Sequence, residues 1–196
     1  MIGASGEAAI SWRALTAYLV VLALQRVGEL VHSARNVRRL RERGAREYAA
    51  GHFPLLVAVH VLFPLCLVTE MVALGSRPTA LWSVALSFWL AAQALRYSAV
   101  GALGERWSVG VWVLPGEPLV RRGPYRFLRH PNYVAVVTEL VAAPMMFGAW
   151  RTAIAITMLN AFALSIRIRA EEAALHDAEG GGGPGGSVAL GPQTGE

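Results

Sequence analysis

The chain has 196 residues, of which 55% are hydrophobic and 16% charged, and its mean hydropathy is +0.43. Soluble domains carry about 25% charged residues, so this composition excludes a water-soluble enzyme with a polar shell and a largely disordered chain. The formal net charge is +5, and all 18 basic residues are arginine. These arginines lie between apolar runs, which favours an integral membrane protein over one with a nucleic-acid partner. The single cysteine, Cys66, has no partner for an intramolecular disulfide, and no Cys/His spacing resembles that of a metal site.

Five apolar runs are long enough, or nearly so, to cross a membrane as helices. Spanning the hydrocarbon core takes about 20 apolar residues, with a range of about 17–25. The predicted spans are Ile10 to Leu30, Phe53 to Leu74, Ala80 to Val100, Val134 to Trp150 and Thr152 to Ile168. The last two meet at Trp150-Arg151 and predict a C-terminal helical hairpin with a very tight connection. The expected fold is therefore all-α, an integral membrane bundle of about five transmembrane helices.

The arginines between the runs predict how the bundle lies in the membrane. One group follows the first run, a second follows the third run, and a pair ends the fifth. Their members are Arg35, Arg38, Arg39, Arg41, Arg43 and Arg46; Arg106, Arg121, Arg122, Arg126 and Arg129; and Arg167 and Arg169. The other side carries Arg77 and Arg151. Because cytoplasmic loops carry an excess of basic residues, we expect the arginine-rich loops and the C-terminus in the cytoplasm and the N-terminus outside.

Residues 1–178 form one predicted transmembrane domain, and residues 179–196 form a Gly-rich cytoplasmic tail with too little apolar surface to order itself. Charged side chains inside the spans need an explanation, because each costs about 2.5–3.5 kcal/mol at mid-bilayer on insertion scales. Arg96 in the third run and Glu139 in the fourth are the main cases. Interhelical pairing is one explanation, and for Glu139 a role in chemistry is the other.

Two polar stretches at the expected cytoplasmic side carry residue types that chemistry needs. The longer loop contains RRGPYRFLRHPNY, from Arg121 to Tyr133, with Gly-Pro and His-Pro turn signals. The last run ends in RIRAEE, from Arg167 to Glu172, in which Arg167 and Glu171 are four apart and share a helical face. Taken alone, the loop is equally typical of a basic segment that holds anionic headgroups, and RIRAEE of an ion pair at a helix end.

These stretches resemble the isoprenylcysteine carboxyl methyltransferase family of membrane methyltransferases, in its bacterial branch. The resemblance rests on GPYRFLRHPNY (Gly123 to Tyr133), PGEPLV (Pro115 to Val120) and RIRAEE (Arg167 to Glu172). In the N-terminal half, RVGEL (Arg26 to Leu30) and RGAREY (Arg43 to Tyr48) also match the bacterial pattern. The resemblance covers about residues 20 to 175 of the sequence. It implies a multi-pass protein of the bacterial inner membrane.

The resemblance implies S-adenosylmethionine as the methyl donor, bound in a cytoplasmic catalytic layer between the polar loop and the last helix. Carried over by position, the cofactor-binding residues are Glu117, Pro118, Leu119, Val120, Tyr125, His130, Pro131, Asn132, Tyr133 and Glu171. Arg167 would face the acceptor, and His130 or Glu139 would remove the proton of a hydroxyl acceptor. The family's upstream polar contact to the cofactor falls on Gly110 in this sequence.

The resemblance also implies the reaction, which is O-methylation of a lipophilic small molecule that reaches the site from the lipid bilayer. The acceptor is expected to be a prenylated cysteine carboxylate or a hydroxyl group on a long-chain phenol, pyrone or similar lipid. Three alternatives stay open. They are N-methylation of a phospholipid, reduction of a sterol-type substrate with NADPH, and a non-catalytic protein that binds anionic lipids. The oligomeric state is open as well.

Overall fold

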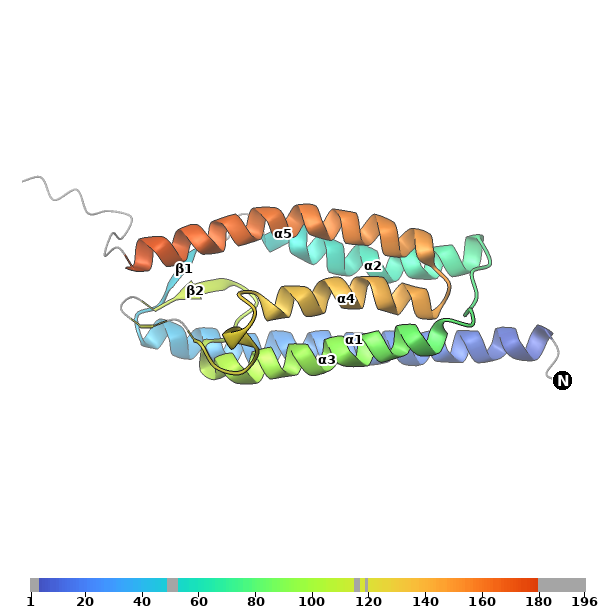
Figure 1. Cartoon of the computed structure of the whole chain (residues 1–196), viewed down its shortest axis with the longest axis horizontal. Coiled ribbons are helices and arrows are strands. Elements are labelled where there is room, and N and C mark those ends of the chain that lie inside the picture. The colour runs from blue at the N-terminus through green and yellow to red at the C-terminus, as the bar shows by residue number, and fades with distance from the viewer. Residues whose placement is uncertain (1–3, 49–52, 115–116, 119, 180–196) are drawn as a thin grey trace, which may run out of the picture.

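The computed structural model describes residues 4–48, 53–114, 117–118 and 120–179 (Figure 1). Five helices run along a common long axis and confirm the all-α bundle. They are α1 (Ala4–Glu42), α2 (Phe53–Ala73), α3 (Trp82–Leu103), α4 (Pro131–Met146) and α5 (Trp150–Glu179). Helix α4 packs against both α3 and α5, and α2 packs against α5. Residues 180–196, which hold nearly all of the expected Gly-rich tail, lie outside the described residues.

The first helix is longer than the apolar run that predicts it. Helix α1 continues through the arginine-rich stretch to Glu42, where the sequence analysis places a loop. Arginine, leucine and glutamate are good helix formers, and no glycine or proline interrupts the chain between Leu30 and Gly44. The first group of arginines therefore lies largely on a continuous helix that extends beyond its apolar part.

Within the described residues, three segments are long and apolar enough to cross a membrane: Trp12–Glu42, Pro54–Ala73 and Trp150–Ala173. The other two expected spans are less suited to crossing alone. Helix α4 has 16 residues and is about 24 Å long at about 1.5 Å per residue, less than the about 30 Å of the hydrocarbon core. Helix α3 has 22 residues but carries Gln93 and Arg96. The structure therefore has five helices and three candidate spans, where the sequence predicts five spans.

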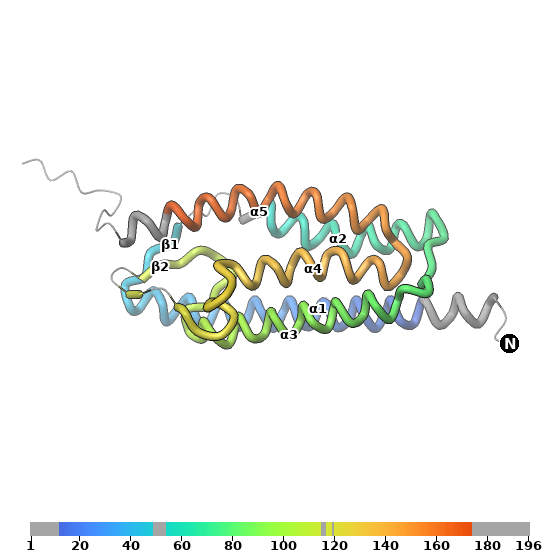
Figure 2. The backbone as a smooth tube through the Cα atoms, in the orientation of Figure 1, coloured from blue at the N-terminus to red at the C-terminus, as the bar shows by residue number. Residues whose placement is uncertain are grey.

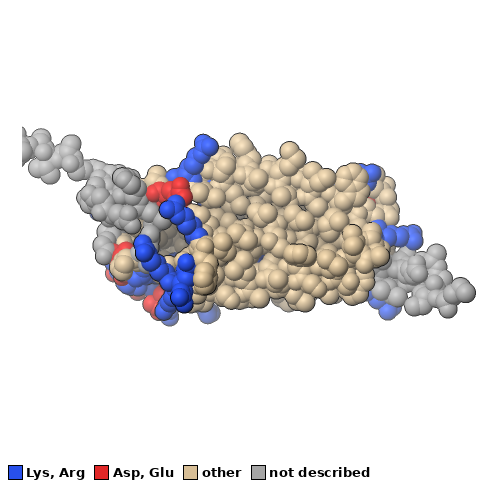
Figure 3. Space-filling view, in the orientation of Figure 1, with Lys and Arg blue, Asp and Glu red and all other residues tan. Residues whose placement is uncertain are grey.

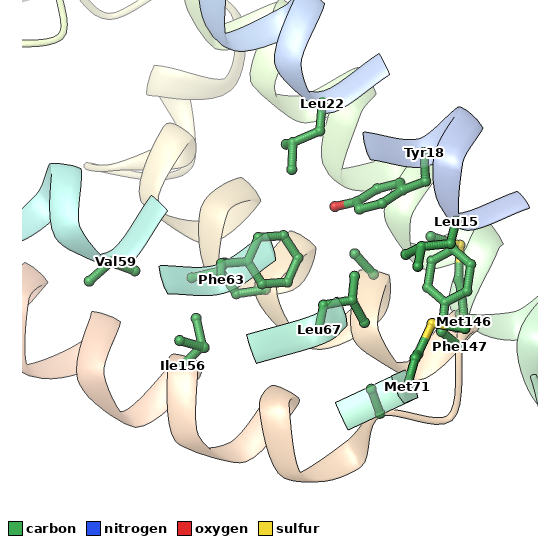
Figure 4. Close-up of a cluster of buried hydrophobic side chains, with 14 of the residues drawn as sticks. Leu15, Tyr18, Leu22, Val59, Phe63, Leu67, Met71, Met146, Phe147 and Ile156 are labelled. Carbon is green, nitrogen blue, oxygen red and sulfur yellow. The ribbon is translucent and has the colours of Figure 1, made fainter. Parts of the chain in front are cut away.

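All five helices contribute to one apolar core (Figure 4). The ring of Tyr18 on α1 lies 6.5 Å from that of Phe63, 6.0 Å from that of Trp89 and 5.8 Å from that of Phe147, measured between centroids. Edge-on and tilted contacts of this kind are the arrangements that aromatic rings prefer. Because the three partners belong to α2, α3 and the turn after α4, these contacts hold α1 against the rest of the bundle.

Large apolar side chains are exposed on every helix. Leu24, Leu65, Phe88, Val141 and Met158 provide one example from each helix and are 42–69% exposed. On the face shown in Figure 3, charged side chains gather at the two ends of the molecule, and most of them lie at the end that holds the strands. An apolar surface of this extent needs a covering. Together with the three candidate spans, it defines an integral membrane protein.

A tight turn at residues 147–149 joins α4 to α5 as the expected helical hairpin. The Ala149 N–H donates to the Pro144 carbonyl at 2.9 Å, which is a common closure at a helix C-terminus. Gly148 has a φ of +70°, and a Cβ atom there would lie 2.1 Å from the carbonyl oxygen of Arg77. Only a residue without a side chain fits this position.

A two-stranded antiparallel sheet, which the sequence analysis does not predict, lies at the arginine-rich end. Strand β1 (Arg46–Tyr48) pairs with β2 (Val111–Val113), and Glu47 is opposite Trp112. The β2 sequence consists of β-branched and aromatic residues, which favour strands. The sheet connects the end of α1 to the segment between α3 and α4, and that segment folds back beside the start of α4 (Figure 2).

Candidate functional site

A cavity of about 940 Å³ lies at the arginine-rich end of the bundle. Its walls come from β2, from the segment between β2 and α4, from the first turn of α4 and from the C-terminal part of α5. Small-molecule sites in proteins usually measure about 300–1,000 Å³. The cavity is therefore large enough for a ligand with several chemical parts.

The hydroxyl group of Tyr133 joins the two helices of the hairpin inside this cavity. Tyr133 lies on the first turn of α4, and Arg167 and Glu171 lie one turn apart on α5. Nε of Arg167 donates to the Tyr133 hydroxyl oxygen at 2.7 Å, and that hydroxyl donates to the Glu171 carboxylate. The Arg167 guanidinium also lies 5.8 Å from the centre of the Tyr133 ring. The two polar stretches of the sequence therefore meet through one phenol.

The turn before α4 brings two more residues to the cavity. His130 precedes Pro131, which takes the first helical position, where a residue without an N–H is tolerated. The rings of His130 and Tyr133 stack, with centroids 5.1 Å apart and planes at 13°. Asn132 lines the cavity, and its buried Oδ1 atom has no hydrogen-bond partner within the described residues. An unpaired buried acceptor costs about 1–3 kcal/mol, so Asn132 is a strained polar group at the edge of the cavity.

Helices α1 and α5 hold the backbone of the segment before β2. Asn36 of α1 donates to the Trp107 carbonyl at 2.8 Å. Ser33, also on α1, accepts from the Val109 N–H at 3.0 Å. From α5, Nη2 of Arg167 donates to the Val109 carbonyl at 2.7 Å. The segment before β2, which forms part of the cavity wall, is thus held by α1 and by α5.

Ion pairs hold the wall after β2. Glu117 pairs with Arg43, the residue that follows α1, and with Arg106 of the short 3-10 helix η2 (Gly104–Arg106). Nη1 of Arg106 also donates to the Pro118 carbonyl at 2.7 Å. Because its carboxylate is paired with cations of its own chain, Glu117 contributes to the cavity mainly by fixing the position of the wall.

Tyr125 lies on a second 3-10 helix, η3 (Gly123–Arg126), and lines the same cavity. Burial, and next the negative charge of Glu171, raise the pKa of the Tyr125 phenol to about 12. The phenol therefore stays neutral at physiological pH. It presents an uncharged ring face and a hydrogen-bond donor to whatever fills the cavity.

Gly110, where the resemblance places a polar contact, also lines the cavity. A Cβ atom there would lie 3.1 Å from Nε1 and 3.4 Å from Cδ1 of Trp112. The Trp112 ring is held in turn by the guanidinium of Arg41, 4.8 Å from its centre. The indole of Trp112 therefore takes the space that a side chain at position 110 would need.

The structure brings most of the predicted site residues to one cavity. Those that line it are Glu117, Pro118, Val120, Tyr125, His130, Asn132, Tyr133, Arg167 and Glu171. Pro131 is fully buried and is not among the lining residues. Leu119 lies outside the described residues. That these side chains bind a cofactor stays a prediction.

Glu139 does not reach the cavity and instead pairs with arginines inside the bundle. Its carboxylate contacts Arg96 of α3 and lies 2.8 Å from Nη2 of Arg26 on α1. Glu29 accepts from Arg26 at 2.7 Å and from Arg96 at 3.3 Å. We call these four residues the buried ion quartet, in which Arg96 and Glu139 are buried and Arg26 and Glu29 are partly buried. Its two positive and two negative charges balance, so interhelical pairing explains Glu139, and we do not place it in the site.

Several lining residues were not selected by the sequence reasoning. They include Leu40, Leu103, Trp107, Val111, Trp112 and Val113, and also Glu172, which lies in the RIRAEE stretch but was not assigned to the site. The run of valine, tryptophan and valine is a weak strand signal that could have drawn attention to β2, whereas nothing in the sequence marks Leu40. Among the described residues, no group of three His, Cys, Asp or Glu side chains is placed to hold a metal ion.

The fold and the cavity define a helical membrane protein with a cavity of small-molecule size at one end. The chain belongs to the isoprenylcysteine carboxyl methyltransferase (ICMT) family, whose profile matches residues 84–177. It is 34% identical over 159 residues to the uncharacterized protein YpbQ of Bacillus subtilis. The aligned region covers 81% of this chain and 95% of YpbQ. It is 26% identical over 144 residues to an uncharacterized protein of Haemophilus influenzae, with 73% and 84% covered. No solved structure matches the chain significantly.

The family match covers the part of the chain that builds most of the cavity. Residues 84–177 run from α3 through β2 and η3 to α5, and they contain Tyr133, Arg167 and Glu171. The resemblance seen in the polar stretches of the sequence is thereby confirmed. Helices α1 and α2 lie outside the matched region.

Proposed function

We propose that this protein transfers a methyl group from S-adenosylmethionine to an oxygen atom of a lipophilic small molecule. The observation that carries the proposal is the hydroxyl group of Tyr133, which contacts both Arg167 and Glu171 inside a cavity of about 940 Å³. All three residues belong to the region that matches a methyltransferase family.

The residues around the cavity fit S-adenosylmethionine. Asn132 lines the cavity, and its side-chain amide can exchange hydrogen bonds with a polar group of the cofactor. The ring face of Tyr125 suits its sulfonium cation, a contact worth about 0.5–2 kcal/mol. The Glu171 carboxylate suits the ammonium group or the ribose hydroxyl groups. When bound, the cofactor supplies an activated methyl group for direct displacement.

Arg167 and His130 are the residues that we assign to the acceptor. A guanidinium has five N–H donors, and within the described residues Arg167 uses two of them, toward Tyr133 and Val109. The remaining donors can hold a carboxylate or hydroxyl oxygen. His130 stacks on Tyr133 and takes the proton when the acceptor is a hydroxyl group. A carboxylate acceptor needs no base, so alignment of its oxygen is then the main task of the site.

We also propose that all five helices cross the bilayer and that the cavity faces the cytoplasm. The arginine-rich segments lie together at one end of the molecule (Figure 3), as cytoplasmic segments do. The charged groups of α3 and α4 are buried in the quartet and do not face lipid. In this arrangement the methyl donor comes from water and the acceptor from the membrane.

Transfer is tested with purified protein and S-adenosylmethionine that carries a labelled methyl group. The acceptors are a long-chain alkylphenol, a prenylated cysteine and phosphatidylethanolamine, each in detergent. We expect label in the alkylphenol or the prenylated cysteine, little in Glu171→Ala, and the wild-type amount in Glu105→Ala. Glu105 is a matched control because it is an exposed glutamate at the same end of the molecule, paired with Arg39.

Two results would count against the proposal. Label in phosphatidylethanolamine alone would establish N-methylation in place of O-methylation. Label in none of the three acceptors, and in no lipid of a bacterial membrane extract, would contradict methyl transfer itself.

A further inference from the structure

A second cavity, of about 310 Å³, lies between α1 and α3. We call it the α1–α3 groove; its walls include Leu24, Gly28 and His32 of α1, Tyr97 and Val100 of α3, and Trp107. From Leu24 to His32 it follows α1 over about 12 Å, at about 1.5 Å per residue. No part of the methyl-transfer proposal uses this groove.

The groove lies on the apolar side of the bundle. Its α1 wall belongs to the candidate span Trp12–Glu42, and Leu24 and Tyr97 at its edge are 68% and 56% exposed. Two polar residues, Gln25 and Glu29, also line it. Both are engaged within the bundle, Gln25 with Gln93 at 2.7 Å and Glu29 with the quartet. The groove therefore offers mainly apolar contact, which suits a hydrocarbon chain.

Trp107 lines both the groove and the larger cavity. Its side chain is 6% exposed, and its ring stacks on that of His32 with centroids 5.3 Å apart and planes at 23°. Asn36 holds its carbonyl at 2.8 Å. The Trp107 indole, which His32 and Asn36 hold against α1, is thus a wall shared by the apolar groove and the polar cavity.

We propose that the α1–α3 groove seats the hydrocarbon tail of the methyl acceptor, with Trp107 as the partition between the tail and the reacting head. This inference rests on the proposed methyl transfer. An amphiphile whose tail lies in the groove has its polar end at Trp107, beside the cavity that contains Tyr133 and Arg167. The volume of about 310 Å³ suits a single-chain amphiphile with a hydroxyl or carboxyl head rather than a two-chain phospholipid.

The groove also identifies the part of the chain that selects the acceptor. Its α1 wall lies outside residues 84–177, the region that matches the family profile. Selection by tail length therefore falls to α1, outside the matched region, together with Trp107, which lies inside that region as most of the donor site does.

Two glycines make a matched pair for the test. Gly28 lines the groove, and Gly101 lies on α3 outside its lining. A Cβ atom at either position meets no atom within 4 Å, so both positions have room for a side chain. Gly28→Trp fills the groove, and Gly101→Trp adds the same side chain elsewhere on the surface.

The probe is an alkylphenol with a diazirine in its tail, cross-linked to the protein by light and mapped by mass spectrometry. We expect label on α1 between residues 24 and 32 and near Tyr97, reduced by excess 4-dodecylphenol but not by phenol. Gly28→Trp should lower this label at least tenfold, and Gly101→Trp should leave it unchanged. Label that is unchanged in Gly28→Trp, or that phosphatidylcholine displaces as well as 4-dodecylphenol does, overturns the inference because it reports ordinary lipid contact.

S-adenosylmethionine binding is measured on the same three samples. Binding that persists in all of them shows that the variants are folded, so a failure of the groove label then concerns the groove alone. Absence of binding in the wild-type protein instead overturns the proposed methyl transfer, and this inference with it.

Discussion

Nε of Arg167 donates to the hydroxyl oxygen of Tyr133 at 2.7 Å, and this bond joins the last helix to the first turn of the helix before it. The same hydroxyl group donates to Glu171. A cation and a carboxylate of α5 are therefore both held by one phenol of α4. This arrangement sets the relative positions of the side chains that we assign to the acceptor and to the methyl donor.

Replacing Tyr133 by phenylalanine should impair methyl transfer more than it impairs folding. The change removes a partner of two charged groups, and a hydrogen bond to a charged group contributes about 1.5–3 kcal/mol. We expect initial rates about 10- to 150-fold lower. Tyr48→Phe, on strand β1 and outside the cavity lining, is the control. Equal losses in the two variants would show that the Tyr133 hydroxyl has no special role.

The buried ion quartet should behave as a coupled unit. Arg96→Ala leaves Glu139, which is 2% exposed, without its partner on α3, and breaking a buried pair costs about 3–5 kcal/mol of the free energy of unfolding. The double variant Arg96→Ala/Glu139→Ala should lose less than the sum of the single losses. Unfolding by denaturant in detergent micelles measures this coupling.

The surface pair Arg39–Glu105 is the reference for this comparison of single and double variants. Its side chains are 56% and 59% exposed, so the pair should contribute at most about 1 kcal/mol. Additive losses at Arg96 and Glu139 would mean that the quartet is not a coupled network.

Gly148→Ala should destabilise the hairpin. The residue has a positive φ, and the new Cβ atom would lie 2.1 Å from the Arg77 carbonyl oxygen. We expect a loss of about 1–3 kcal/mol in the free energy of unfolding. Gly101→Ala, on a helix with open space around it, should instead keep or raise the stability. A thermal melt that ranks the two variants the other way would contradict the turn geometry.

The phenol of Tyr125 should make stability fall at high pH. Its pKa is about 12 in the folded protein and about 10 in an unfolded chain. Below pH 10 both states are protonated and the contribution is fully present. Between pH 10 and 12 the unfolded state loses the proton first, so the free energy of unfolding falls as pH rises. Tyr125→Phe should show a shallower fall in this window, and an identical slope would contradict the raised pKa.

Hydropathy predicted the positions of the helices better than their lengths. The run from Phe53 to Leu74 corresponds closely to α2, which is Phe53–Ala73. The same criterion missed the end of α1 at Glu42, because hydropathy reports contact with lipid and not helix formation. Hydropathy also predicted α3 and α4 as spans. It could not show that their charged residues, Arg96 and Glu139, pair with each other, because that pairing depends on how the helices pack.

The site was predictable where it depends on short motifs and not where it depends on tertiary pairing. Tyr133 and Arg167 lie in motifs whose spacing is visible in the sequence, and the structure places them in contact. Glu139 lies six residues after Tyr133, which sets it about 9 Å further along α4 and away from the cavity. Trp112 reaches the cavity through the pairing of β2 with β1, two segments far apart in the chain. Such a pairing leaves little trace in a single sequence.

Calorimetric titration of S-adenosylmethionine into the detergent-purified protein tests the central claim most directly. We expect saturable binding to the wild-type protein and to Glu105→Ala, at least tenfold weaker binding to Glu171→Ala, and no binding of NADPH. Binding of NADPH without binding of S-adenosylmethionine would contradict methyl transfer in favour of a reductase. Binding of neither, in a folded sample, would contradict an enzymatic role for the cavity and favour a protein that binds anionic lipids.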